Sequence, residues 1–174
     1  MAALKPQDVV VLLRLATPKG HYQGSHADLA RSSGISPGEL TKSLQRSEQA
    51  NLYDSSRSNV RRGELIEFVV HGIRYAFPAV RGPIGRGVPT SIAAYPLREA
   101  FAGAGEDPLR TPVWPHPEGG VLGYAIEPLY RTVPDVAPRL KAFHALLALT
   151  DAIREGRARE RKLAADLLQI RLSL

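Results

Sequence analysis

From Ser25 to Leu52 the chain reads SHADLARSSGISPGELTKSLQRSEQANL, and this stretch contains two helix-start signals eleven residues apart. Ser25 is followed three residues later by Asp28, and Ser36 is followed three residues later by Glu39. This is the spacing of a capping box, in which both side chains accept hydrogen bonds from backbone amides that the first helical turn leaves free. The acidic residues also lie where the helix dipole favours negative charge. The stretch therefore predicts two short helices joined by one tight turn.

The residues between the two signals fit such a turn. Gly34 favours the left-handed conformation that ends a helix, and Ile35 is an apolar residue that can fill the gap between two helices. Pro37 suits the first position of a helix, where its missing amide costs nothing. A helical period of about 100° per residue places small and apolar residues on the inner side of the pair. These residues are Leu29, Ala30, Leu40, Leu44 and Ser47. The pattern is that of a helix-turn-helix.

The opposite face of the second helix is polar along its whole length. Its outer and flanking positions are Thr41, Lys42, Gln45, Arg46 and Gln49, and Ser36 lies at the start of the same helix. Hydroxyl, amide and cationic side chains are those that hydrogen-bond to base edges in the major groove of DNA. We therefore expect this face to bind DNA. The alternative is that the motif serves only dimerisation or protein docking.

The chain resembles the winged-helix transcription regulators of bacteria and archaea, broadly those of the multiple-antibiotic-resistance type, over about its first third. The resemblance lies in Leu29-Ala30, Gly34-Ile35-Ser36, Leu40, Leu44 and Gln49-Ala50-Asn51-Leu52. It implies a homodimeric regulator, here expected to be a repressor, that lays the second helix in the major groove of double-stranded DNA. It also implies a β-hairpin wing that contacts the flanking minor groove or backbone. After Asp54 the chain runs into a helical pattern without a regular second strand, so we expect this wing to be truncated or replaced.

The charge of the chain agrees with a nucleic-acid partner. The formal net charge is +6, the sequence pI is about 9.9, and Arg outnumbers Lys. Because guanidinium groups can bind phosphates with two hydrogen bonds, we expect Arg57, Arg61 and Arg62 to contact phosphates beside the recognition helix. The alternative is that a modest excess of solvated arginine only keeps the protein soluble.

The most unusual local sequence is Arg81–Thr90, which reads RGPIGRGVPT. Its three glycines and two prolines predict a loop without regular structure. Such a loop could lie against phosphates through its backbone amides, which makes Arg81 and Arg86 candidate DNA contacts. It could equally be a purely structural surface loop. A nucleotide site is less favoured, because the stretch lacks the Gly-Lys-Ser/Thr ending of a P-loop.

Length and composition limit the class of protein. With 174 residues, of which 44% are hydrophobic, the chain can bury a core as one domain or two small lobes. It contains no cysteine, which excludes disulfides and thiolate metal sites. No apolar run approaches membrane-spanning length, and the opening Met-Ala-Ala-Leu-Lys-Pro leads straight into an expected helix. We therefore expect a cytoplasmic protein without a signal peptide or a membrane partner.

The remaining sequence predicts both helices and strands. An apolar helix from Pro6 to about Ala16 has almost no polar face, so it must pack on a partner subunit or lie under the C-terminal part of the chain. Helical spacing begins near Arg62 and is expected to end at Gly72, followed by an alternating strand at 73–77. A second strand at 121–126 could pair with the first one.

The C-terminal part predicts two helices, at 137–155 and 157–172, with a break at Gly156. The expected fold is therefore α+β and mostly α, with an N-terminal winged-helix-like domain, a small sheet and a C-terminal helical pair. The expected division is a winged helix-turn-helix domain at 1–60, a mixed α/β segment with Gly/Pro-rich loops at 61–135, and the helical pair at 136–174. This pair is a candidate dimerisation element because its apolar residues face more than one side.

The sequence gives little support for catalysis. The five histidines show no metal-ligand spacing, and no nucleophile, base and orienting group are recognisable together. We therefore expect no enzyme activity, no metal and no other cofactor. A second function class is a protein-interaction module, such as an antitoxin or adaptor, that binds a protein partner through its C-terminal helices. A third is a sensor with a small-molecule pocket beneath Trp114, although a lone tryptophan is more often a lid on a core.

Overall fold

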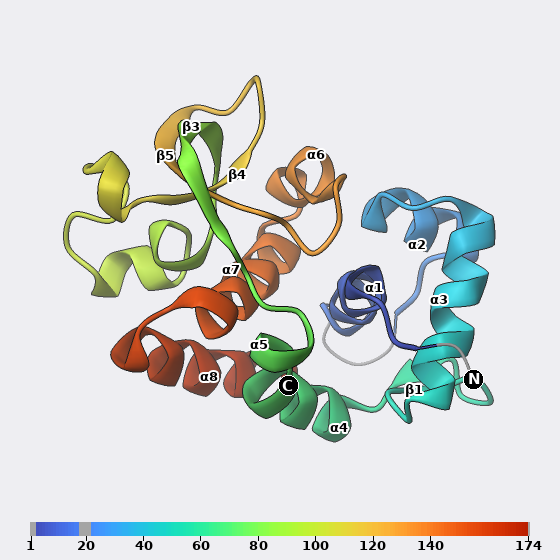
Figure 1. Cartoon of the computed structure of the whole chain (residues 1–174). Helices are drawn as coiled ribbons and strands as arrows, with labels where there is room; N and C mark the ends of the chain where they lie inside the picture. Colours follow the sequence, from blue (N-terminus) through green and yellow to red (C-terminus); the bar gives the residue numbers. More distant parts are fainter. Residues whose placement is uncertain (1–2, 18–21, 174) are drawn as a thin grey trace.

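The computed structural model describes residues 3–17 and 22–173 (Figure 1). Its N-terminal elements form the right-hand part of the view. They are the helices α1 (Pro6–Ala16), α2 (His26–Ser33) and α3 (Pro37–Gln49), and the strands β1 (Tyr53–Asp54) and β2 (Asn59–Val60). α1 packs against both α2 and α3, and β1 pairs antiparallel with β2. A short hairpin with two residues in each strand thus follows α3, at the place where the sequence predicts a wing that is truncated or replaced.

Helix α1 lies in the interior of the molecule. Every residue from Val9 to Leu13 is completely buried. The helix packs against α3 on one side and against α7 (Lys141–Glu155) on another. The sequence left open whether α1 packs on a partner subunit or under the C-terminal part of its own chain. In the structure its apolar faces are buried within its own chain.

The chain from Arg62 to Ala76 is helical throughout. It comprises α4 (Arg62–Glu67), one π-helical turn (Phe68–Gly72) and α5 (Ile73–Ala76). The predictions that Gly72 ends the helix and that 73–77 is a strand are therefore wrong. The reason is that Leu65, Val69 and Ile73 lie four residues apart and are all completely buried, so one helical face continues through the glycine.

The second half of the chain contains a small closed barrel of three strands, seen at the upper left of Figure 1. The strands are β3 (Arg81–Pro89), β4 (Pro112–Pro115) and β5 (Val121–Ile126). β3 runs antiparallel to both of the others, and β4 and β5 are parallel to each other. The predicted strand at 121–126 is confirmed, but its partners are β3 and β4 and not residues 73–77.

The prediction that 81–90 forms an irregular loop is wrong, because the glycines and prolines shape a coiled strand. Gly87 pairs with residues of both neighbouring strands, and a β-carbon there would overlap the carbonyl oxygen of Trp114. Only glycine therefore lets β3 and β4 approach this closely. The pairing shifts register between Arg81 and Ile84, and Pro83 lies in this irregularity, where a missing amide is tolerated.

The barrel connects to the C-terminal helices through short elements. Three 3-10 turns, at Ser91–Ala93, Leu97–Ala100 and Pro108–Arg110, lie between β3 and β4. After β5 come α6 (Val133–Val136), a 3-10 turn (Ala137–Arg139), α7 and α8 (Ala158–Leu172). The helical pair and its break at Gly156 are as predicted, although the regular part of the first helix begins only at Lys141.

Helix α7 packs against elements from both the N-terminal and the C-terminal parts of the chain. It contacts α1, α5, α8 and the turn Ser91–Ala93, and its residues from Ala145 to Arg154 are all buried. The structure is thus α+β and mostly helical, with small sheets. Within the described ranges, none of the helices is both long enough and apolar enough to cross a membrane.

Candidate nucleic-acid interface

The first helix start has the complete capping box that the sequence predicts, whereas the second has only half of it, because the Glu39 carboxylate bonds to Gln7 and Arg46. The Ser25 hydroxyl accepts a hydrogen bond from the Asp28 amide at 3.1 Å, and the Asp28 carboxylate accepts one from the Ser25 amide at 3.2 Å. The Ser36 hydroxyl accepts the Glu39 amide at 3.2 Å, and Ser36 is thereby engaged as a cap. Gly34 between the helices has a φ of 72°, which is the left-handed conformation expected of it. Local capping thus fixes where α3 begins and how it leaves the turn.

The inner face of the helix pair is also confirmed. Leu29, Ala30, Ile35, Leu40, Leu44 and Ser47 are all buried. On α3 the predicted outer residues Thr41, Lys42, Gln45 and Gln49 are all exposed. In Figure 1 α3 forms the right-hand edge of the molecule, and α1 lies to its left. These four side chains therefore face solvent.

Arg46 does not belong to this outer face, contrary to the prediction. Its side chain is only 6% exposed and turns inward to Asp8 on α1, which is completely buried. Nε donates to Asp8 Oδ2 at 2.8 Å and Nη2 donates to Oδ1 at 2.6 Å, which makes a two-pronged ion pair. Nη2 also donates to Glu39 Oε1 at 2.7 Å. Arg46 therefore joins α3 to α1 and does not present a cation to solvent.

The hydrogen bonds around Arg46 and Asp8 extend to the first turns of α1 and α3. Gln7 donates to Glu39 Oε1 at 3.0 Å, and the Lys5 amide donates to Asp8 Oδ2 at 2.8 Å. The hydrogen bond from Arg46 is the main reason that the pKa of Glu39 is lowered. The sequence does contain a signal for this network, because Asp8 stands at the start of a largely apolar helix, where a buried carboxylate needs a partner.

The hairpin, whose strand β1 packs against α3, has Arg57 in its turn and Arg61 directly after β2. Asp54 orders the turn by accepting hydrogen bonds from the amides of Ser56 and Arg57. Hydrogen bonds from the Ser56 hydroxyl and from the Arg57 amide lower the pKa of Asp54. The Arg57 side chain is 82% exposed and only 3.9 Å from Asp54. Arg61 is 40% exposed and lies 3.8 Å from the same carboxylate. Both guanidinium groups are thus at least partly exposed to solvent on the hairpin that packs against α3.

Arg62 occupies a structural position. Its Nη1 donates to the carbonyl oxygens of Ala16 at 3.0 Å and Leu172 at 3.1 Å, which lie at the ends of α1 and α8. Cations at helix C-termini offset the negative end of the helix dipole. The guanidinium therefore holds two helix ends together, and this structural role does not support the prediction that Arg62 contacts flanking phosphates.

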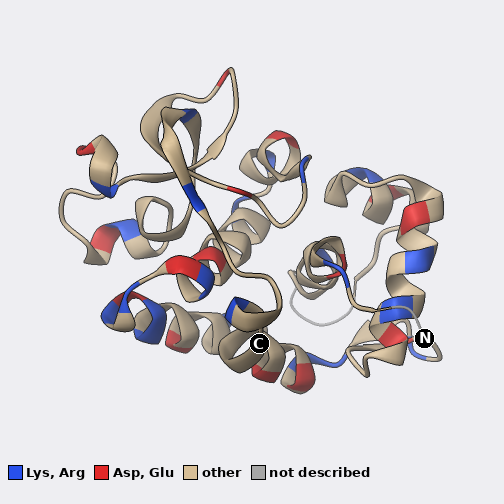
Figure 2. Ribbon diagram, viewed as in Figure 1, with Lys and Arg blue, Asp and Glu red and all other residues tan. Residues whose placement is uncertain are grey.

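Arg81 and Arg86 lie on the barrel, at the opposite side of Figure 1 from α3. Arg81 Nη2 donates to Glu155 Oε2 at 2.8 Å, and its guanidinium lies 4.5 Å from the centre of the Tyr124 ring. Arg86 is exposed on β3. Figure 2 likewise shows Lys and Arg both on α3 and at the start of α8, at opposite ends of the view. The structure therefore does not bring these two arginines together with α3 on one surface.

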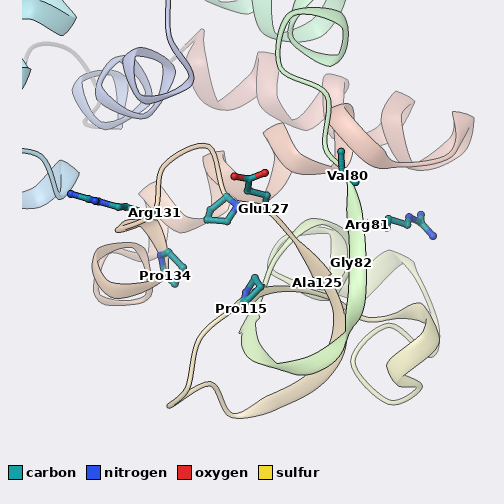
Figure 3. Close-up of a pocket in the computed structure, with 9 residues that line it drawn as sticks. Val80, Arg81, Gly82, Pro115, Ala125, Glu127, Arg131 and Pro134 are labelled. Carbon is teal, nitrogen blue, oxygen red and sulfur yellow. The ribbon is translucent and has the colours of Figure 1, made fainter.

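A cavity of about 440 Å³ lies beside Arg81, between β3, β5 and the segment around α6 (Figure 3). Pro115, Ala125 and Pro134 form apolar parts of its lining. Arg81 and Arg131 lie at opposite sides of it and point away from each other in Figure 3. The two guanidinium groups therefore do not converge on one anion.

A buried polar network that sequence reasoning missed joins the barrel to α7. Asp151 Oδ2 accepts hydrogen bonds from Trp114 Nε1 and Thr90 Oγ1, both at 2.7 Å, and Arg154 donates to Oδ1 at 2.6 Å. Glu155 accepts a bond from Ser91 at 2.8 Å, and burial raises its pKa. No local sequence pattern predicts this network. Apart from Arg154, the partners of Asp151 and Glu155 named here lie 37 or more residues away in the sequence.

The part of the chain that the structure describes contains no group of three histidine or carboxylate side chains placed to hold a metal ion. Compared with known proteins, the chain matches no protein-family model, no curated protein and no solved structure. Its function must therefore be argued from its own residues.

Proposed function

We propose that this protein is a sequence-specific DNA-binding transcription regulator, acting as a repressor through a winged-helix-like N-terminal part. The observation that carries the proposal is the outer face of α3, where Thr41, Lys42, Gln45 and Gln49 are exposed on a helix that is capped and held rigidly by α1. The major groove of DNA admits an α-helix, and these side-chain types hydrogen-bond to base edges. The short hairpin after α3 takes the place of the wing.

The proposed roles follow the exposure of each side chain. Gln45 and Gln49 contact base edges, where an amide can make two hydrogen bonds to adenine. Arg57 and Arg61 bind flanking phosphates, which positions α3 without reading sequence. Lys42 is the cation of the α3 face itself. With these three cations on phosphates, the logarithm of the binding constant should fall with the logarithm of salt concentration at a slope of about −2.7 per protomer.

We further propose that the regulator is a homodimer. The apolar faces of α1 are covered by α3 and α7, so a second copy must use another surface. On α8, Ile170 is exposed and Leu163 and Leu167 are partly buried, which makes this helix the candidate contact. Light scattering should give a dimer for the wild type and a monomer for Ile170→Asp. An unchanged dimer would exclude α8 as the contact.

The experiment that tests DNA binding is a fluorescence-anisotropy titration with the DNA upstream of the protein's own coding region, in the presence of random competitor. Gln45→Ala should weaken binding to the specific site by about 1–3 kcal/mol and leave random DNA unaffected. Arg57→Gln should weaken binding to all sequences alike and reduce the salt slope by about 1 per protomer. Arg86→Gln is the matched control, because this exposed arginine lies on the barrel.

Two results would count against the proposal. If Gln45→Ala and Arg57→Gln bind as the wild type does, α3 and the hairpin are not the interface. If the wild type binds all sequences equally weakly, only charge attraction is present, and the protein-interaction module with a protein partner becomes the better hypothesis.

A further inference from the structure

Three arginines line one pocket at the junction of the N-terminal and C-terminal elements. The pocket has a volume of about 320 Å³ and lies between the last turn of α1, helix α2 and the turn that precedes α7. Arg14, Arg31 and Arg139 come from these three elements in that order. We call it the arginine pocket. We propose that the arginine pocket binds a phosphate group.

The first argument is charge. The lining has three guanidinium groups and one carboxylate, Asp28, so its formal charge is +2. Asp28 is already engaged, because Oδ1 accepts from Arg31 at 2.9 Å and Oδ2 accepts from the Ser25 hydroxyl at 2.6 Å. It therefore cannot also neutralise Arg14 and Arg139. Guanidinium groups do not lose their protons in proteins, so the excess charge remains at every physiological pH.

The second argument is preorganisation. The Arg14 guanidinium donates through Nε to Ser32 Oγ at 2.9 Å and lies 5.2 Å from the centre of the Tyr22 ring. These two contacts orient the planar group and use only one of its five N–H donors. Its remaining donors have no acceptor among the described residues. A fixed guanidinium with free donors loses little entropy when an anion binds.

The third argument is Arg139, which is exposed and has neither an ion pair nor a hydrogen-bond acceptor among the described residues. It therefore stands ready to bind an anion without breaking a contact of the fold. A phosphate monoester carries a charge of about −1.5 to −2 at neutral pH, which matches the formal charge of the lining. Its oxygens also fit the two-pronged donor geometry of guanidinium groups.

The phosphate can belong to a phosphorylated small molecule or to the DNA backbone, and in both cases it would tie α2 to the C-terminal part. A link already exists nearby, since Thr132 Oγ1 donates to the Gly34 carbonyl oxygen at 2.8 Å in the turn between α2 and α3. An anion in the arginine pocket would strengthen this junction and restrain the orientation of α2 and α3. The phosphate site itself does not depend on the proposed function, and only its DNA source does.

The test is thermal unfolding with inorganic phosphate as the probe, at constant ionic strength, with chloride replaced stepwise. The wild type should show a saturable increase in Tm of about 3–6 °C at ten times the dissociation constant. In Arg139→Gln the dissociation constant should rise about 10- to 100-fold, because one or two charged hydrogen bonds are lost. Arg31→Gln is a second variant on another element. Arg110→Gln, an exposed arginine outside the pocket, is the control and should respond as the wild type does.

The proposal is overturned if phosphate gives no saturable increase in the wild type, or if Arg139→Gln and Arg31→Gln respond like the control. A second arm assigns the source. Competition between phosphate and DNA, together with weaker DNA binding by Arg139→Gln, would assign the site to a backbone phosphate. Unchanged DNA binding by Arg139→Gln would assign it to a phosphorylated small molecule. If the protein binds no DNA, the proposed function fails while the phosphate titration still decides the pocket.

Discussion

The ion pair between Arg46 and Asp8 leads to a quantitative prediction about stability. Replacing Arg46 by Met removes the guanidinium but keeps most of the apolar stem. Asp8 would remain completely buried, and of its present partners only the Lys5 amide would be left. Removing one member of a buried ion pair typically costs about 3–5 kcal/mol, because an uncompensated charge stays inside the protein. For a chain of this length the corresponding decrease in Tm is about 6–20 °C.

The double variant Asp8→Leu/Arg46→Met separates the buried charge from the packing. Replacing both members of a buried pair by apolar groups is often close to neutral, so the double variant should regain most of the loss. The surface pair Arg31–Asp28 is the matched control, because its side chains are 77% and 52% exposed. Arg31→Met should therefore cost less than about 1 kcal/mol.

The assay is urea unfolding followed by circular dichroism and by the fluorescence of Trp114, with the free energy of unfolding extrapolated to water. A loss below about 1 kcal/mol in Arg46→Met would mean that the pair is not buried in solution. A double variant as unstable as Arg46→Met would mean that the loss comes from packing and not from the charge of Asp8. Either result would refute the reasoning and would reopen the possibility that Arg46 faces DNA.

Three further predictions follow from other sites. Gly87→Ala should destabilise the protein by about 1–3 kcal/mol or more in thermal or urea unfolding, because the new β-carbon would overlap β4. Gly85→Ala is the control, because a β-carbon there meets open space, and it should change the stability by less than about 1 kcal/mol. Burial lowers the pKa of His144, so the folded state is stabilised while the imidazole is neutral. This stabilisation is fully present above pH 6.5 and is lost as the pH falls through the folded-state pKa. Its ring lies 5.1 Å from the Trp114 ring, so Trp114 fluorescence should titrate with a midpoint below 6.5, and His144→Gln should remove this transition. The pKa of Glu39 is also lowered, so the ionised carboxylate stabilises the fold above pH 4.5, and this stabilisation is lost as the pH falls through the folded-state pKa. The free energy of unfolding of Glu39→Gln should therefore depend less on pH in this acid range. Urea unfolding at several pH values measures this dependence.

The parts of the fold that could be predicted from sequence depend on short-range interactions. The hydroxyl groups of Ser25 and Ser36 each accept a hydrogen bond from the amide three residues later, and Gly34 adopts its left-handed conformation within the turn itself. A helical period then separates the inner from the outer side of α3. All this information lies within a single stretch of sequence, so the helix starts, the turn and the exposed face could be predicted before any tertiary contact was known.

The errors concern residues whose conformation depends on distant partners. The local sequence of β3 has the composition of a loop, and it is a strand only because Gly87 lets two other strands pair with it closely. Arg46 is on the flank of α3 by helical period, and its direction is decided by Asp8, 38 residues earlier. A polar side chain on a flank can turn either way, and periodicity alone does not distinguish the two.

These corrections change how the proposed interface would read DNA. Arg46, Arg62 and Arg81 are all engaged with other parts of the chain, so the positive net charge is not concentrated at α3. The outer face of α3 then depends mainly on the neutral amides of Gln45 and Gln49, which gain energy only when the matching base edge is present. Non-specific attraction to phosphates is weak for such a face, and specificity must come from the orientation of α3. The buried Arg46–Asp8 pair, which joins α3 to α1, is therefore expected to affect sequence discrimination without contacting DNA.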